Sequence, residues 1–269
     1  MKDSNSRKLW FSFLICCLLV APSLSAQTAA AKKEIVRQAR QAYYSLRNEG
    51  LIEFQCSLSP NWDALIADQR KKDPSAADAG LKTLNQIHFS MSLGPDGAVE
   101  VTHNNVPAQN DEAAKGFDQI YVGMEQMVKG FFQTASPFIL SPPFPEVDSE
   151  YQLEEQGTQY RLSYKEGTAD VVTTMSKDFA VTALKVSTAE FESSIQPRFI
   201  KTARGFLLAG YVADYQSKSP TEATHLNVQM AYQEISGLQL PRNLNLSGTH
   251  GGSPFAVEVT FSGYQVKKR

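Results

Sequence analysis

Apolar and polar residues alternate through most of the C-terminal half of the chain, which is the period-two pattern of strands that bury one face. The clearest runs lie at 206–215, 226–232, 238–246 and 255–261. Shorter runs of the same kind lie at 151–155, 159–165, 170–175, 179–191 and 195–204. Because the parity is kept from run to run, we expect an antiparallel sheet with one apolar and one polar face.

A strand and a hairpin are expected in the N-terminal half. Residues 51–58 alternate in the same way, and the turn Gly94-Pro95-Asp96-Gly97 separates two further alternating runs. The hairpin register that places Phe89 and Met91 on one face with Val99 and Val101 sends His88 and His103 to opposite faces. A metal site shared by these two histidines is therefore not expected.

Four segments have the periodicity of amphipathic helices. They are 30–48, which Gly50 should stop, 60–71 with Ser59-Pro60 as its start, 76–86, and 111–135. The last is the longest, and its apolar residues form one broad stripe. Ser136-Pro137 and the proline cluster that follows should end it.

Helices early in the chain and strands late indicate the α+β class. We expect a strongly curved antiparallel sheet of about nine to eleven strands, an open half-barrel covered by the long helix and the shorter helices, in a single domain over 27–269. Such a sheet has more concave apolar area than these helices can cover. The sequence therefore predicts a cavity between the long helix and the sheet.

Glycines recur every seven residues along the long helix, at 116, 123 and 130, although an interior helical glycine costs about 1 kcal/mol relative to alanine. They indicate either tight packing against a neighbour or a seam through which a lipid chain or a lid movement passes. Residues of the helix stripe and of the apolar sheet face are the candidate ligand-binding residues, and most of them could equally be plain core. The candidates are Phe89, Met91, Gly123, Met127, Gly130, Phe131, Phe132, Met230, Tyr232, Val257 and Phe261.

The N-terminus has the order of a secretory signal peptide. Basic residues among the first eight precede an apolar run over 9–20, which is too short to cross a membrane. Small residues up to Ala26 predict cleavage before Gln27, so we expect an exported protein of the periplasm or the extracellular medium. Cys16 and Cys17 lie in this leader, so the mature part, with Cys56 alone, cannot form an internal disulfide.

Charge and motifs exclude several function classes. The formal net charge of −2 does not favour nucleic acid as a partner. The sequence has no glycine-flanked serine elbow, no phosphate-binding glycine loop and no His-Glu-x-x-His zinc helix. His225 and His250 have no carboxylate or cysteine at metal-ligand spacing. We therefore expect no cofactor, no metal and no catalysis, although an enzyme whose site has no sequence motif stays open.

The stretch Ile235-Ser236-Gly237-Leu238-Gln239-Leu240-Pro241-Arg242 and the later Tyr264-Gln265-Val266 resemble the C-terminal part of the outer-membrane lipoprotein carrier and sorting superfamily. The order of elements over most of 30–266, including the runs 160–164 and 181–188, is also similar to that superfamily. The insert at 59–86 is larger than in a minimal carrier. The resemblance implies an unsealed barrel whose interior holds acyl chains during transport between envelope membranes, with envelope membrane proteins as partners.

Fold analogy does not decide function, so three interpretations follow from the sequence. The first is a non-catalytic exported protein that binds a lipid or another hydrophobic ligand. The second is an envelope scaffold or protein-interaction module with a filled core. The third is a hydrolase without a recognisable motif.

Overall fold

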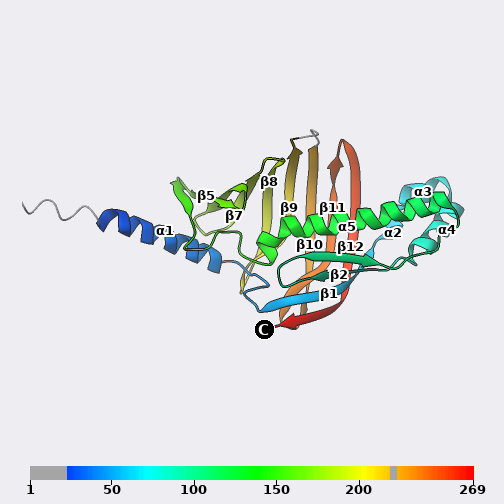
Figure 1. Ribbon diagram of the computed structural model, residues 1–269, viewed down its shortest axis with the longest axis horizontal. Coiled ribbons are helices and arrows are strands. Elements are labelled where there is room, and N and C mark those ends of the chain that lie inside the picture. Colours follow the sequence, from blue (N-terminus) through cyan, green and yellow to red (C-terminus); the bar gives the residue numbers. More distant parts are fainter. Residues whose placement is uncertain (1–22, 219–222) are drawn as a thin grey trace, which may run out of the picture.

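The structure is a computed structural model and describes residues 23–218 and 223–269. Within these residues, five helices accompany one sheet of twelve strands (Figure 1). The helices are α1 (Ser23–Gln41), α2 (Trp62–Leu65), α3 (Ala67–Lys72), α4 (Pro74–Leu84) and α5 (Asp111–Ile139). The strands are β1 (Leu51–Pro60), β2 (Phe89–Leu93), β3 (Val99–His103), β4 (Tyr151–Gln156), β5 (Gln159–Glu166), β6 (Ala169–Ser176), β7 (Val181–Ser187), β8 (Phe191–Thr202), β9 (Gly205–Ser217), β10 (Ala223–Ile235), β11 (Leu238–His250) and β12 (Ser253–Lys268).

The sheet is antiparallel and open. From β4 to β12 each strand pairs with the next along the chain, and β12 then pairs with β1, which continues to β2 and β3. The edge strands β3 and β4 do not meet, so the barrel is not closed. The predicted α+β class and open antiparallel sheet are confirmed. The predicted number of strands is too low, because each alternating run forms a strand of its own.

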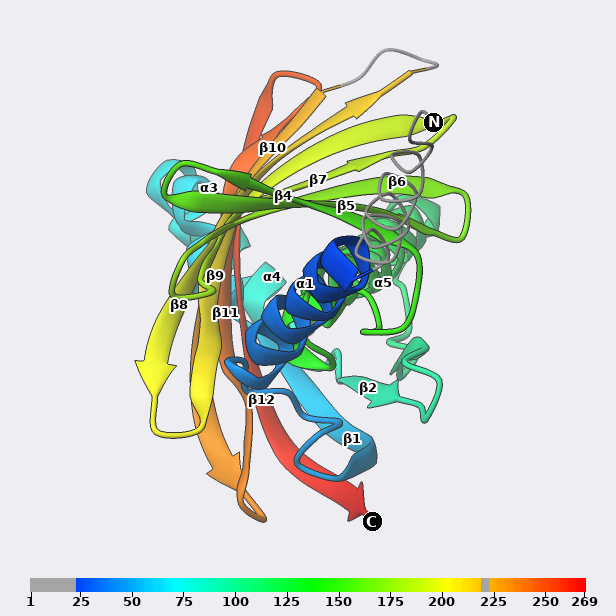
Figure 2. The ribbon, with the colours of Figure 1, turned by 90° about the vertical axis from the view of Figure 1, so that its left-hand side faces the viewer.

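The sheet curves around two helices. Figure 2 shows β4 to β7 above α1 and α5, β8 to β12 at their side, and β1 below them. Pairing between neighbouring strands shifts register at several points, as between Arg198 and Phe199 in β8 and between Ala231 and Tyr232 in β10. Such bulges bend a strand and increase its twist, which favours curvature. The helices α2, α3 and α4 lie at one end of the molecule (Figure 1).

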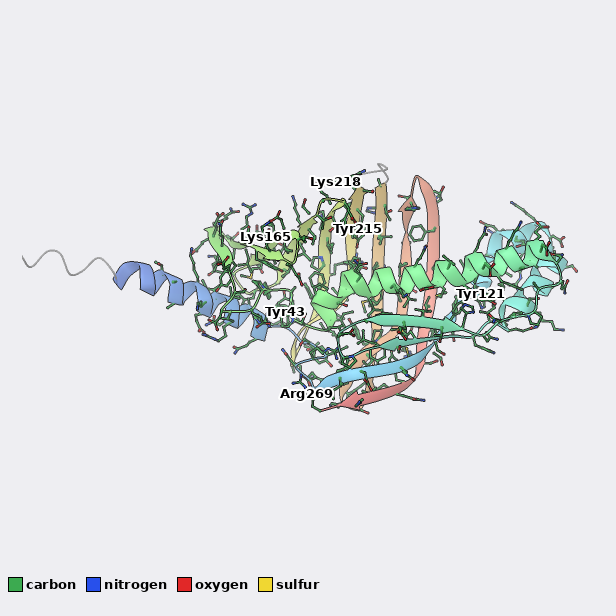
Figure 3. All side chains as sticks on the ribbon, viewed as in Figure 1. Tyr43, Tyr121, Lys165, Tyr215, Lys218 and Arg269 are labelled. Atoms are coloured by element: carbon green, nitrogen blue, oxygen red, sulfur yellow. The ribbon has the colours of Figure 1, made fainter. Side chains whose placement is uncertain are left out.

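The dense part of the core lies where α5 meets the N-terminal strands. The rings of Phe132 on α5 and Phe54 on β1 are 6.4 Å apart. Near the other end of the contact, the Tyr121 ring stacks on His103 of β3 with centroids 3.7 Å apart. The helix therefore packs along β1, β2 and β3, and it also contacts β9, where Tyr215 lies (Figure 3).

The first helix ends earlier than predicted. It stops at Gln41, seven residues before the expected end at 48, and Tyr43 forms a parallel bridge with Phe206 of β9. The Tyr43 hydroxyl donates to the Phe179 carbonyl and accepts from the Val181 amide. Tertiary hydrogen bonds thus replace the helical ones, and Gly50 lies in the turn before β1 instead of capping the helix.

The two short helical segments also start at other residues than predicted. Pro60 is the last residue of β1, where it pairs with Val259, and Asn61 caps α2. The predicted helix 60–71 is accordingly split into α2 and α3. The next helix, α4, begins at Pro74, and the Asp73 side chain accepts from the Ala76 amide to cap it.

The long helix continues through the expected stop, because Pro137 lies inside α5 and the helix ends at Ile139. The Ser136 hydroxyl donates to the Phe132 carbonyl in this last turn, and the Leu140 amide donates to the Ser136 carbonyl. Proline lacks an amide donor, but near the end of a helix this removes few bonds.

The predicted strand 179–191 is interrupted. The Thr188 hydroxyl accepts from the Glu190 and Phe191 amides and turns the chain between β7 and β8. Phe179 precedes β7 with a positive φ of 70°.

The hairpin register is the one expected. Phe89 pairs with His103 and Met91 with Val101, so His88 and His103 have opposite parity. Cys56 is buried and free. The predicted leader lies outside the described residues up to position 22, and the predicted cleavage position falls near the start of α1.

Tyr43→Phe should destabilise the fold, since it leaves the Phe179 carbonyl and the Val181 amide without their partner at a site that is 3 % exposed. We expect a loss of about 1–3 kcal/mol in the free energy of unfolding, measured by urea denaturation. Tyr160→Phe is the control, because the Tyr160 ring is half-buried beside the Lys177 ammonium, and it should change little. Equal stability of Tyr43→Phe and the unaltered chain would show that these two bonds do not hold the start of β7.

Candidate functional site

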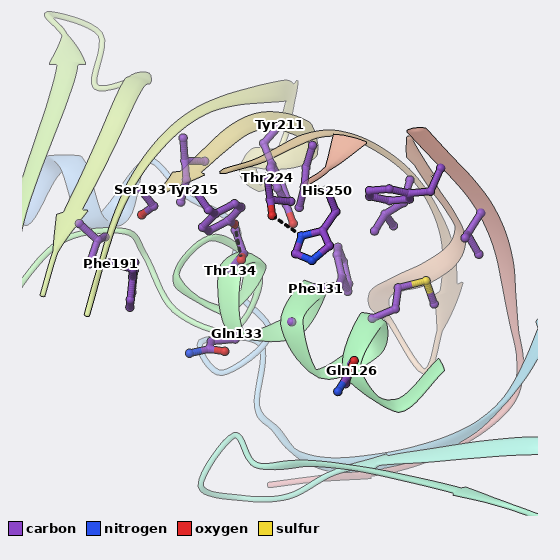
Figure 4. A pocket seen from close by; sticks show the side chains of 18 of the residues that line it. Gln126, Phe131, Gln133, Thr134, Phe191, Ser193, Tyr211, Tyr215, Thr224 and His250 are labelled. Atoms are coloured by element: carbon purple, nitrogen blue, oxygen red, sulfur yellow. Dashed lines mark hydrogen bonds between the residues drawn. The ribbon is translucent and has the colours of Figure 1, made fainter. Parts of the chain in front are cut away.

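A cavity of about 1140 Å³ lies between α5 and the concave face of the sheet (Figure 4). Its lining residues come from α2, from α5 and from concave-facing positions on every strand from β5 to β12. They are Trp62, Leu65, Ile120, Gly123, Met124, Gln126, Met127, Gly130, Phe131, Gln133, Thr134, Pro137, Glu166, Ala169, Val171, Leu184, Val186, Phe191, Ser193, Ile195, Tyr211, Tyr215, Thr224, Leu226, Leu246, His250, Phe255 and Val257. Most of these side chains are apolar.

The strand residues of the lining share one face of the sheet because they are paired in register. Ile195 lies opposite Ala213, which lies opposite Leu226 on the next strand. Leu246 lies opposite Val257 in the same way. The alternation seen in the sequence therefore places these residues together, as expected for period-two strands.

The glycines of α5 face open space. A Cβ atom added at Gly116, Gly123 or Gly130 would have no neighbour within 4 Å. Tight packing, one of the two explanations for the seven-residue spacing, is therefore wrong. Gly123 and Gly130 line the cavity, and the absence of side chains there widens it.

The structure brings five of the candidate ligand-binding residues to the cavity: Gly123, Met127, Gly130, Phe131 and Val257. The other six lie outside its lining. Phe89, Met91, Phe132, Met230 and Phe261 are buried in the hydrophobic core.

Tyr232 is the sixth, and its hydroxyl donates to the Leu208 carbonyl at 2.6 Å. These six share the apolar stripe or sheet face with the lining residues. They differ because they belong to the packed core or lie against it.

Sequence reasoning missed the lining that comes from the middle strands. Leu184, Ile195 and Phe255 belong to alternating runs, so their parity was visible. The sequence does not show which part of the apolar face the helix leaves uncovered. Tyr211 and Tyr215 also have this parity, but an isolated tyrosine in a strand does not by itself indicate a binding site.

Two pairs of polar side chains in the cavity are hydrogen-bonded. The Thr134 and Tyr215 hydroxyls are 2.6 Å apart, and Thr224 Oγ1 is 2.8 Å from His250 Nδ1 (Figure 4). Burial raises the pKa of the Tyr215 phenol above its ordinary value. The phenol therefore stays protonated at neutral pH and can donate a hydrogen bond.

Tyr211 is fully buried, and its hydroxyl has no hydrogen-bond partner among the described residues. Burial also raises the pKa of this phenol. A buried hydroxyl without a partner costs about 1–3 kcal/mol. The cavity wall thus contains a polar group that no described residue satisfies.

The lining is almost free of charge. Glu166 contributes a carboxylate, and no lysine or arginine belongs to the described lining. Among the described residues no group of three His, Cys, Asp or Glu side chains has the geometry to hold a metal ion. The chemistry that this lining offers is apolar contact together with hydrogen bonding by hydroxyl, amide and imidazole groups.

The fold and the site together define an α+β protein with an open, curved antiparallel sheet and an apolar cavity under one long helix. Comparison of the chain with known protein families, with curated proteins and with solved structures gives no match. Within the described part of the chain, no helix is both long enough and apolar enough to span a bilayer.

Gly130→Ala and Gly123→Ala should each stabilise the protein by about 1 kcal/mol, because alanine favours the helix and its methyl group meets nothing. Thermal or urea unfolding measures the change. The control is Gly210→Ala in β9, where the new Cβ would lie 2.1 Å from the Val228 carbonyl oxygen and φ is +151°. This variant should lose stability. A loss at Gly130 or Gly123 would instead indicate that a neighbour packs against the helix there.

Proposed function

We propose that this chain is an exported, non-catalytic protein that binds a lipid or an acyl chain between α5 and the curved sheet. The observation that supports the proposal best is the cavity, whose volume of about 1140 Å³ is slightly above the range of about 300–1,000 Å³ for small-molecule sites. Filled cores leave few voids larger than a water molecule. A space of this size is therefore a feature to be explained by an occupant.

The chemistry of the lining favours a hydrocarbon chain. Apolar side chains such as Phe131, Leu184 and Val257 form most of the wall. Each methylene transferred from water to such a wall contributes about 0.8 kcal/mol, so a long chain gains affinity from contact alone. Methionines of α5, including Met127, can adapt to chains of different shape.

Transport in the cell envelope is the physiological role that we infer. The leader-like N-terminus supports export to the periplasm or the medium, with cleavage before Gln27. The resemblance to the lipoprotein carrier and sorting superfamily supports delivery between membranes, with envelope membrane proteins as partners. An open barrel whose interior is almost free of charge is consistent with a carrier that releases its ligand without chemistry.

Two observations favour other roles. The unpaired edges β3 and β4 could each add a strand from a partner, as in an envelope scaffold without ligand. The contact between Thr224 Oγ1 and His250 Nδ1 has the geometry of a nucleophile and its base, as in a hydrolase. Hydrolysis of a nitrophenyl ester that Thr224→Val abolishes would favour the enzyme over the carrier.

Gly130→Phe tests the ligand-binding proposal. The added ring would project into the cavity from a position with open space around it, so it should block a ligand without disturbing the core. We expect the unaltered protein to bind the fluorescent apolar probe phenylnaphthylamine and to carry extra lipid mass in native mass spectrometry. The variant should bind the probe at least about tenfold more weakly and lose the extra mass, because its ring occupies the space.

Gly116→Phe is the matched control, since it makes the same change on the same line of α5 but outside the lining of the cavity. It should bind the probe like the unaltered protein. If the unaltered protein and both variants bind no probe and carry no extra lipid mass, the result would favour the scaffold and contradict the proposal.

Export is tested separately in a Gram-negative host that expresses the full chain. The periplasmic fraction should contain protein whose first residue is Gln27, as read by N-terminal sequencing or intact mass. Leu18→Arg places a charge in the apolar run and should leave uncleaved chain in the cytoplasm. Uncleaved chain that is retained in both cases would contradict the leader.

A further inference from the structure

One row of the concave face is polar, although the next row toward the middle of the strands is apolar. Ser193, Tyr215, Thr224 and His250 lie on β8, β9, β10 and β11, and each is paired directly with the next across the sheet. All four line the cavity. We call these four residues the polar row. Figure 4 shows them one after another on the sheet side of the cavity, across from α5.

The rows that follow along the strands are apolar. Two residues further along each strand lie Ile195, Ala213, Leu226 and Gly248, again paired in register. The polar row is thus a band across four strands and not a set of scattered side chains. A cavity with a polar band beside an apolar body matches an amphiphile, whose head and tail differ in the same way.

Three residues of the polar row, Tyr215, Thr224 and His250, are hydrogen-bonded without a ligand. The row can still form further hydrogen bonds. Thr224 contacts His250, and Tyr215 contacts Thr134 of α5. A hydroxyl group has one donor and two acceptor lone pairs, so one bond leaves capacity for another. Ser193 adds a further hydroxyl that is 7 % exposed. Tyr211 lies two residues before Ala213 on β9. Its hydroxyl is buried and has no hydrogen-bond partner among the described residues.

The charge of the lining indicates what kind of head group fits. A carboxylate or phosphate head would be matched by lysine or arginine, which form the strong charge-assisted bonds. The described lining contains neither, and its one carboxylate, Glu166, would repel an anion. Hydroxyl and imidazole groups that both donate and accept suit an uncharged head instead.

We propose that the ligand is an uncharged single-chain amphiphile, such as a long-chain alcohol or a monoacylglycerol, whose hydroxyl or ester head binds the polar row while its chain extends over the apolar rows. This inference rests on the proposed function, because it assumes that the cavity holds a lipid. It goes further by assigning the head-group site and its charge.

Displacement of bound phenylnaphthylamine from the full chain by dodecanol, dodecanoate and dodecane at neutral pH tests the assignment. These three compounds have similar chains and differ in their heads. Dodecanol should displace the probe at the lowest concentration, and dodecanoate should need roughly tenfold more. Thr224→Val should weaken dodecanol about fivefold, the effect of one lost hydrogen bond, and leave dodecane unchanged.

Thr249→Val is the matched control, because Thr249 is next to His250 on the same strand but is exposed on the opposite face. It should leave all three affinities unchanged. Tyr215→Phe provides the same test should Thr224→Val fail to fold, since it removes a hydroxyl of the polar row and keeps the ring.

The outcomes separate this inference from the proposed function. Failure of the unaltered protein to bind the probe or any chain would overturn the function, and the inference with it. Binding of all three compounds with equal strength, or an unchanged dodecanol affinity in both variants, would overturn the polar row alone. A preference for dodecanoate would overturn the uncharged head and leave the carrier intact.

Discussion

One long helix cannot cover a twelve-stranded concave face, and the rest of the structure depends on this geometric limit. A helix with its side chains is about 10–12 Å wide, whereas neighbouring strands are about 4.8 Å apart, so one helix covers two or three strands. The structure places α5 over β1, β2 and β3, where Phe54 and Phe132 meet. The inner face of the middle strands is therefore left to a cavity.

Several local features keep that space open. The sheet curves around α5, and the glycines at 123 and 130 leave open space beside the helix. The Thr134 and Tyr215 hydroxyls join the helix to β9 at one point. Tyr43 fixes the start of β7. The packed core and the cavity thus lie in different parts of the molecule.

The polarity of the inner face follows the same division. Where the helix packs, buried side chains such as Met91 and Phe261 form a dry core. Where the helix does not pack, hydroxyl groups and an imidazole can line the cavity, because they hydrogen-bond to one another or to solvent. A buried polar group without a partner is unfavourable, so the unpaired Tyr211 hydroxyl stands out in the cavity wall. An occupied cavity with an uncharged polar head at the row of hydroxyls would unite these observations.

Local patterns in the sequence are enough to predict the order of elements, the α+β class and the parity of the strands, because period-two and helical patterns are local. They also predict the parity of the hairpin pairing, which gives His88 and His103 opposite faces. The end of the first helix, the course of α5 through Pro137 and the division of the apolar face into core and cavity were decided by tertiary structure. Phe132 and Phe131 are adjacent in sequence and equally apolar, yet Phe131 lines the cavity and Phe132 does not. That difference depends on which strands face the helix, and no pattern of neighbouring residues contains this information.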